Sequence, residues 1–106
     1  MRIYISADIE GISGIAHWDE ATPEHPDYSA FRVRMNEQVA AACVGALLGG
    51  ATAMTVRDGH GPGRNLVHDE LPEAATLIRA WSGDPMAMVE GLGAEHAALA
   101  CVGFHA

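Results

Sequence analysis

The chain has 106 residues, a length at which one domain buries roughly two-thirds of the surface that its unfolded form exposes. Its formal charge of -8 at neutral pH repels nucleic acid and anionic membranes, so we expect neither as a partner. The basic residues are all arginines, and the lack of lysine excludes Schiff-base chemistry and the lysine of a phosphate-binding P-loop.

The chain opens on an alternating, β-branched run that predicts a strand from Arg2 to Asp8. No apolar segment behind a basic start precedes this strand, so the sequence shows no signal peptide and predicts a cytoplasmic protein. The next segment, 12–27, holds two prolines and several acids. Such a composition predicts an irregular surface loop.

Apolar residues then recur at spacings of three and four, which predicts an amphipathic helix over 28–48. We expect Asp27 or Ser29 to cap its start. The pair Gly49–Gly50 should end it, because glycine tolerates the left-handed conformation at helix ends. A second strand is expected over 51–57, and the order strand, helix, strand predicts a parallel crossover.

The second half of the chain shows weaker patterns. After a Gly-Pro-Gly turn at 61–63, Asn65 is expected to cap a short helical segment that Pro72 ends. The other expected elements are a strand over 75–80, a helical turn over 86–91 and a buried strand over 97–104. Periodicity alone does not separate a strand from a helix in the last of these, and its length favours a strand.

These elements predict a single α/β domain over residues 1–106, with a mainly parallel sheet and flanking helices. The two cysteines, Cys43 and Cys101, lie in apolar stretches and lack the spacing of a redox or zinc motif. We therefore expect both to be buried, reduced thiols.

Acids and imidazoles follow three of the expected strands. Asp8 and Glu10 follow the first, His60 follows the second and His105 follows the last. The carboxyl ends of parallel strands gather at one edge of a sheet, so these side chains should meet there. Two neighbouring carboxylates repel one another, and either a divalent cation or a shared proton relieves the repulsion. The sequence predicts a metal site at the carboxyl ends of the strands.

A mixed set of oxygen and nitrogen ligands suits zinc, manganese or iron better than calcium, and zinc is the first choice. Two zinc ions sharing a bridging carboxylate need about five protein groups, whereas this chain offers four. Either the site holds one ion, or a fifth ligand lies beyond Ala106. The alternatives are plain structural roles, in which Asp8 and Glu10 serve turn chemistry, Asp58 holds His60, and His105 is a satisfied core residue.

Four motifs occur in order along the chain: Ser6-x-Asp8-x-Glu10-Gly11-Ile12-Ser13-Gly14, Asp58-x-His60, Met88-Val89-Glu90-Gly91 and Gly103-Phe104-His105-Ala106. Together they resemble the zinc D-aminopeptidases of the bacterial dipeptide-transport operon. The resemblance implies a two-zinc hydrolase that acts on small peptides with D-residues at the amino terminus. It also implies an α/β subunit that forms a homo-oligomer of stacked rings.

By position, the resemblance implies that Asp8 bridges the two ions, with Glu10 and His60 on one side and His105 on the other. Asp58 would support the ligands from a second layer. The family's remaining glutamate ligand and a histidine proposed to act in catalysis lie downstream of these motifs. The resemblance therefore implies that the chain is the N-terminal part of a longer subunit and is incomplete by itself.

Two residues differ from the family pattern, since Arg57 and Gly59 replace the usual neighbours of Asp58. Arg57 is expected to place a cation near the site. Two other functions remain open. One is a phosphohydrolase of the haloacid-dehalogenase type, with Asp8 as nucleophile and Glu10 as acid, although the chain lacks the lysine that such chemistry needs. The other is a metal-binding or assembly subunit without turnover.

Overall fold

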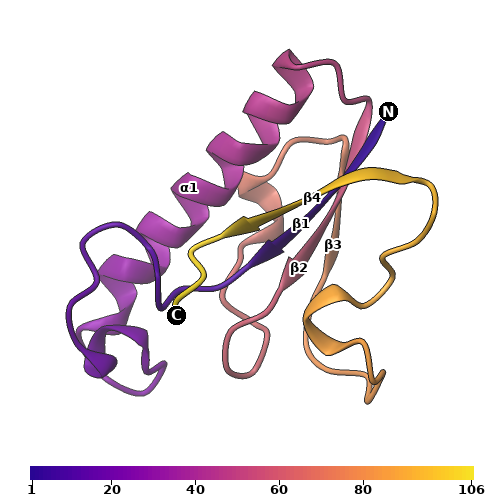
Figure 1. Cartoon of the computed structure of the whole chain (residues 1–106). Helices are drawn as coiled ribbons and strands as arrows, with labels where there is room; N and C mark the ends of the chain where they lie inside the picture. Colours follow the sequence, from indigo (N-terminus) through magenta and orange to yellow (C-terminus); the bar gives the residue numbers. More distant parts are fainter.

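The computed structural model describes all 106 residues and contains one four-stranded parallel sheet (Figure 1). The strands are β1 (Arg2–Ala7), β2 (Ala53–Asp58), β3 (Ala75–Ile78) and β4 (His96–Val102). They lie in the order β3-β2-β1-β4, and every neighbouring pair is parallel. The α/β class and the parallel sheet expected from the sequence are confirmed.

One long helix, α1 (Tyr28–Leu48), links β1 to β2 and covers one face of the sheet (Figure 1). Its bounds agree with the predicted helix. Asp27 occupies the N-cap position, but its side chain makes no capping hydrogen bond. The chain leaves the helix through Gly50, whose φ of 107° lies in the region that favours glycine. No helix in the structure combines the length and the apolar character needed to cross a membrane.

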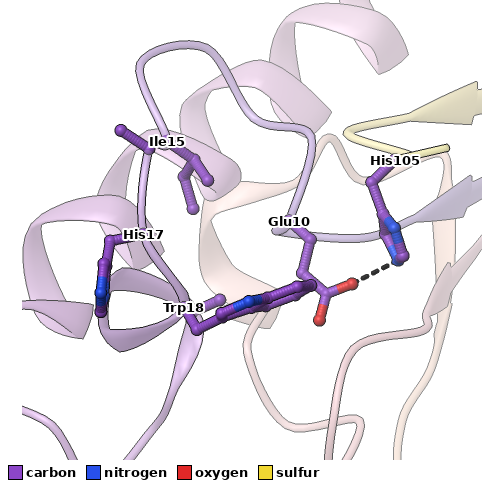
Figure 2. A pocket seen from close by; sticks show the side chains of 7 residues that line it. Glu10, Ile15, His17, Trp18 and His105 are labelled. Atoms are coloured by element: carbon purple, nitrogen blue, oxygen red, sulfur yellow. Dashed lines mark ion pairs between the residues drawn. The ribbon is translucent and has the colours of Figure 1, made fainter.

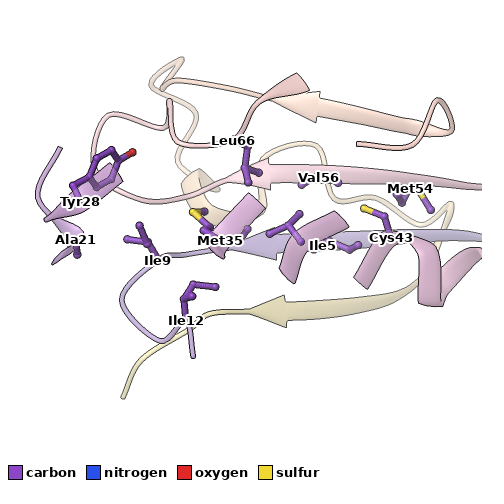
Figure 3. Packing of buried hydrophobic residues seen from close by; sticks show 12 residues of the cluster. Ile5, Ile9, Ile12, Ala21, Tyr28, Met35, Cys43, Met54, Val56 and Leu66 are labelled. Atoms are coloured by element: carbon purple, nitrogen blue, oxygen red, sulfur yellow. The ribbon is translucent and has the colours of Figure 1, made fainter. Parts of the chain in front are cut away.

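The core lies between α1 and the sheet (Figure 3). The apolar stripe of the helix contributes Met35, Val39 and Cys43, each fully buried. Alternating residues of the central strands, including Ile5 and Val56, face this stripe. Burying one such side chain stabilises a fold by about 1.5–3 kcal/mol. The packing therefore fixes α1 on the sheet, and the parallel pairing of β1 with β2 places the loops that follow them at the same end.

Three short 3-10 helices complete the chain: η1 (Trp18–Ala21), η2 (His68–Glu70) and η3 (Ala87–Val89). The first interrupts the segment that was expected to be wholly irregular. The second is the expected short helix before Pro72, but the residue at its N-cap is Val67. The prediction that Asn65 caps it was wrong, because the Asn65 side chain is fully buried and donates its hydrogen bonds to Asp58 and to the carbonyl of His60.

Strand β4 corrects a second expectation. Its apolar sequence predicted a buried strand, yet most of its side chains are exposed, and Leu99 is 45% exposed. β4 is an edge strand that pairs with β1 alone, and little of the rest of the chain packs on its two faces. Cys101 lies on this strand and is exposed, so only Cys43 is the buried thiol that was expected.

The face of the sheet opposite α1 is covered by the segment 81–91. Tyr4 Oη donates a hydrogen bond of 2.6 Å to the carbonyl of Glu90, and Arg57 Nη1 lies 3.3 Å from the Glu90 carboxylate. The Arg57 guanidinium also lies 4.0 Å from the centre of the Trp81 ring. The expected cation beside the site is therefore absent, since Arg57 alternates with Asp58 along β2 and pairs on this other face.

Candidate metal centre

The candidate ligands come together at the carboxyl ends of β1, β2 and β4. Backbone hydrogen bonds extend the sheet slightly past these strands: Asp8 N donates to Val102 O at 2.9 Å, and Gly59 N donates to Ala7 O at 2.9 Å. Figure 1 shows the C-terminus beside the loop that leaves β1. The convergence predicted from the sequence is therefore present in the structure.

Asp8 lies at the centre of the cluster, with each carboxylate oxygen facing a different imidazole. Its Oδ1 is 3.1 Å from His60 Nδ1, and its Oδ2 is 3.7 Å from His105 Nε2. The Asp8 side chain is only 10% exposed. Because β1 ends at Ala7, one residue before the predicted end of the strand, Asp8 and Glu10 both lie in the turn that follows it.

Glu10 reaches both imidazoles from the solvent side. Its Oε1 is 3.8 Å from His60 Nδ1, and its Oε2 contacts His105 Nε2 (Figure 2). One ligand atom each from Asp8, Glu10 and His105 lie within 4.8 Å of one another. His105 is 46% exposed, which contradicts the alternative that it is a satisfied core residue.

Asp8, Glu10 and His105 fit a zinc ion in both chemistry and spacing, and His60 lies beside Asp8. Carboxylate oxygens and imidazole nitrogens bind zinc at about 2.0–2.2 Å, so two ligands of one tetrahedral ion lie about 3.3–3.6 Å apart. The separations from Asp8 and Glu10 to His60, and from Asp8 to His105, run from 3.1 to 3.8 Å. Only small adjustments would bring these groups to coordination distance.

Electrostatics keeps Asp8 ionised. Burial by itself would raise the pKa of Asp8, but hydrogen bonds from His60 and from the N–H groups of Ile9 and Glu10 outweigh it and hold the pKa below its usual 3.8. His60 shows the reverse balance. Burial would lower its pKa, yet the neighbouring Asp8, Glu10 and the carbonyl of Ala21 raise it above 6.5. The cluster therefore favours positive charge, whether from a proton or from a metal ion.

The other ring nitrogen of His60 fixes the orientation of the imidazole. His60 Nε2 lies 2.5 Å from the carbonyl oxygen of Ala21, at the end of η1. A carbonyl only accepts, so Nε2 carries the proton of this hydrogen bond. In the neutral ring, Nδ1 then directs its lone pair at Asp8 and Glu10. A second hydrogen bond of this kind is the usual support of a metal-bound histidine.

Asp58 does not touch the imidazole of His60, contrary to the alternative that it holds this ring. Its carboxylate instead accepts hydrogen bonds from Asn65 N at 2.6 Å, Asn65 Nδ2 at 2.8 Å and Leu66 N at 2.7 Å. Asp58 therefore acts on the backbone of the turn that carries His60. This role of Asn65 was not predicted from the sequence, where its one signal is a short polar residue after a glycine-rich turn.

The remaining histidines lie outside the cluster. His17, His25 and His68 are paired with nearby acids at the surface. His96 has a side chain only 3% exposed, and its Nε2 lies 3.1 Å from Thr55 Oγ1. None of these rings approaches Asp8 or Glu10.

A pocket of about 440 Å³ opens next to Glu10 and His105 (Figure 2). Its other walls come from the loop after β1 and from η1, and they are Ile15, Ala16, His17, Trp18 and Ala21. The Trp18 ring is exposed and meets His105 edge to face, with ring centres 6.4 Å apart. The arrangement puts an apolar surface directly beside the ligand cluster.

Comparison with known proteins places the chain in a family. The D-aminopeptidase family, peptidase family M55, matches residues 1–106. A D-aminopeptidase from Bacillus subtilis is 34% identical over 108 residues, covering 100% of this chain and 38% of that protein. The solved structure described as the Zn-dependent D-aminopeptidase DppA from Bacillus subtilis, a self-compartmentalizing protease, superimposes with a TM-score of 0.94 at 32% identity.

That structure is matched over 100% of this chain and 38% of its own length. The chain thus spans 38% of the length of either relative. The match covers all four strands, α1 and the cluster of acids and imidazoles, because it extends over every residue described above. By sequence and by fold, the chain belongs to the D-aminopeptidase family.

Proposed function

We propose that this chain forms the N-terminal, metal-binding part of a zinc aminopeptidase that hydrolyses the first peptide bond of small peptides carrying a D-residue at the amino terminus. The observation that carries the proposal is the meeting of two carboxylates and two imidazoles in a member of the D-aminopeptidase family. The Bacillus subtilis relative is described as zinc-dependent, which supports zinc as the metal.

In this proposal Asp8 would be shared by two ions, with His60 and Glu10 as ligands on one side and His105 on the other. The support is geometric, since the two oxygens of Asp8 face His60 and His105 respectively. Bound zinc would polarise the scissile carbonyl and lower the pKa of a bound water to about 7. The fifth ligand and the catalytic residue are expected beyond Ala106, in the portion that this chain does not include.

The substrate would approach through the pocket beside Glu10 and His105. Carboxylate oxygens that the metal leaves free would hold the ammonium group of the peptide, which explains a preference for free amino termini. The apolar walls from Ile15, Ala16 and Trp18 would contact the first side chain. Comparing peptides with free and acetylated amino termini tests this step, and equal turnover of the two would contradict it.

The complete protein is further proposed to assemble into a homo-oligomer, because the related structure is described as a self-compartmentalizing protease. A cytoplasmic location stays a prediction. The phosphohydrolase alternative finds no support, since both oxygens of Asp8 are engaged with imidazoles and the chain lacks lysine. A metal-binding subunit without turnover remains the second candidate for the 106-residue chain itself.

The deciding experiment measures hydrolysis of D-Ala-D-Ala and L-Ala-L-Ala with added zinc, for this chain and for the full-length protein. We expect turnover of the D-peptide by the full-length protein, and its loss in Asp8→Ala but not in His68→Ala, whose ring is exposed and distant. Activity confined to the longer protein identifies the present chain as incomplete. No activity in either, with zinc bound, would favour the non-catalytic subunit.

A further inference from the structure

We propose that Asn65 is a positioning residue that holds the turn after β2 in the one shape that aims His60 at the metal site. The inference rests on the proposed zinc function. Asn65 is fully buried, lies five residues after His60 and makes no contact with any candidate ligand atom. Its influence would act entirely through the backbone of the turn.

The side chain of Asn65 ties the end of β2 to the residue that carries the imidazole. Asn65 Nδ2 donates one hydrogen bond to Asp58 Oδ1 at 2.8 Å and another to the carbonyl oxygen of His60 at 2.7 Å. Its Oδ1 accepts a hydrogen bond of 2.5 Å from the hydroxyl of Tyr28. Both amide protons are used, so the orientation of the amide is fixed.

The backbone of Asn65 is held just as firmly. Its N–H donates to Asp58 Oδ2 at 2.6 Å, and its carbonyl accepts from Arg32 Nε at 2.8 Å and from Asn36 Nδ2 at 3.0 Å. Arg32 and Asn36 lie one turn apart on α1. Asn65 therefore connects the helix, the sheet and the His60 turn through one buried residue.

The turn depends on such an anchor because its own sequence is permissive. Gly61 and Gly63 both have positive φ, 53° and 68°. Glycine can adopt many other backbone conformations at similar free energy, so these two residues do not hold the turn in one shape. Within the turn, the carbonyl of His60 accepts from Gly63 N at 2.8 Å as well as from Asn65 Nδ2. The imidazole contacts the carbonyl of Ala21 and the Asp8 carboxylate. The turn is also held through the carbonyls of Gly61 and Gly63, which accept hydrogen bonds from Trp81 Nε1 at 2.6 Å and from Ala80 N at 2.8 Å. Loss of Asn65 would leave the backbone of His60 with a single local hydrogen bond.

A double-mutant cycle on zinc affinity tests the proposal. Zinc dissociation constants would be measured by competition with a chromophoric chelator for the parent chain, Asn65→Ala, His60→Ala and the double variant. We expect Asn65→Ala to weaken zinc binding by about 10–100-fold, the range for residues that orient a metal ligand without contacting the metal themselves. In the His60→Ala background the same change should have less than about a twofold effect, because the ligand that Asn65 positions is gone.

The control is Tyr4→Phe, which removes one partly buried hydrogen bond on the opposite face of the sheet. It should lower stability to urea without altering zinc affinity. If Asn65→Ala changes only stability, or weakens zinc equally with and without His60, then Asn65 is merely structural and the proposal is wrong. If Asn65→Ala does not fold, Tyr28→Phe replaces it, because this change removes the hydrogen bond to Asn65 Oδ1. Tyr28→Phe should weaken zinc binding by less than the range expected for Asn65→Ala, and only when His60 is present.

A metal-free measurement separates this inference from the proposed function. Histidine ring signals in a two-dimensional NMR spectrum report the surroundings of each imidazole. We expect Asn65→Ala to shift and broaden the signals of His60 while leaving those of His68 and His96 in place. If the parent chain fails to bind zinc, the proposed function falls, whereas unchanged His60 signals would overturn the role of Asn65 by themselves.

Discussion

The backbone of Gly11 lies directly against the carbonyl group of Phe104, leaving no room for a side chain between them. Gly11 N also donates a hydrogen bond of 2.7 Å to the carbonyl of Gly103. Through this contact the turn that carries Asp8 and Glu10 is joined to the segment that follows β4. The placement of the Asp8 and Glu10 carboxylates relative to His105 therefore depends on Gly11, which is not a candidate ligand itself.

Replacing this glycine should disturb the metal site from outside it. We expect Gly11→Ala to push the Phe104 backbone away, to cost about 1–3 kcal/mol of unfolding free energy as overpacking does, and to weaken zinc binding. Urea unfolding and chelator competition measure the two effects. The matched control is Gly45→Ala in α1, where a Cβ meets nothing within 4 Å and helix propensity predicts a gain of roughly 0.5–1 kcal/mol. Equal behaviour of the two variants would contradict this account.

The candidate ligands should differ in how much zinc each one holds. Asp8 faces both imidazoles, so Asp8→Ala should abolish zinc binding beside His60 and beside His105. His60→Ala and His105→Ala should each weaken zinc binding only on their own side of Asp8. Zinc content after gel filtration, measured by atomic emission, checks the order. His68→Ala is the control because its ring is largely exposed and pairs only with Asp69. Normal zinc content in Asp8→Ala would show that the ligand set is wrong.

The sequence predicted that the candidate ligands meet because each of them follows a strand, and parallel topology alone brings strand ends together. Helix α1 was equally predictable from the sequence, since its apolar spacing and terminal glycines are local signals. The hydrogen bonds that support the His60 turn were not predictable, because Asn65 contacts Asp58, Tyr28 and the rest of α1, which only tertiary packing brings together. For the same reason the apolar composition of β4 indicated a strand but not what covers it.

Arg57 shows how a buried charge can be read wrongly from its neighbours in sequence. It is fully buried, its Nη1 pairs with Glu90 at 3.3 Å, and its Nε and Nη2 have no hydrogen-bond partner. Removing the one carboxylate should leave the guanidinium uncompensated. We expect Glu90→Ala to destabilise the chain by about 3 kcal/mol, near the lower end for a broken buried pair because Glu90 is partly exposed.

Urea unfolding of Glu90→Ala tests this expectation, with Glu95→Ala as the control because the Glu95 side chain is well exposed. The control should change the unfolding free energy by less than about 0.5 kcal/mol. Zinc affinity should stay near the parent value in both variants, since Glu90 lies against the face of the sheet opposite α1. A loss of zinc in Glu90→Ala without loss of stability would instead link Arg57 to the metal site.

The two thiols should differ sharply in reactivity. Cys43 is completely buried in the core, and burial raises its thiol pKa above 9.0, so little thiolate forms near pH 8 and reagents cannot reach it. Cys101 is exposed on the edge strand. A chromogenic disulfide reagent should therefore label one thiol quickly in the native chain and two in denaturant. Cys101→Ser should abolish the fast reaction while Cys43→Ser leaves it intact, and rapid labelling of both native thiols would contradict the packing of α1 against the sheet.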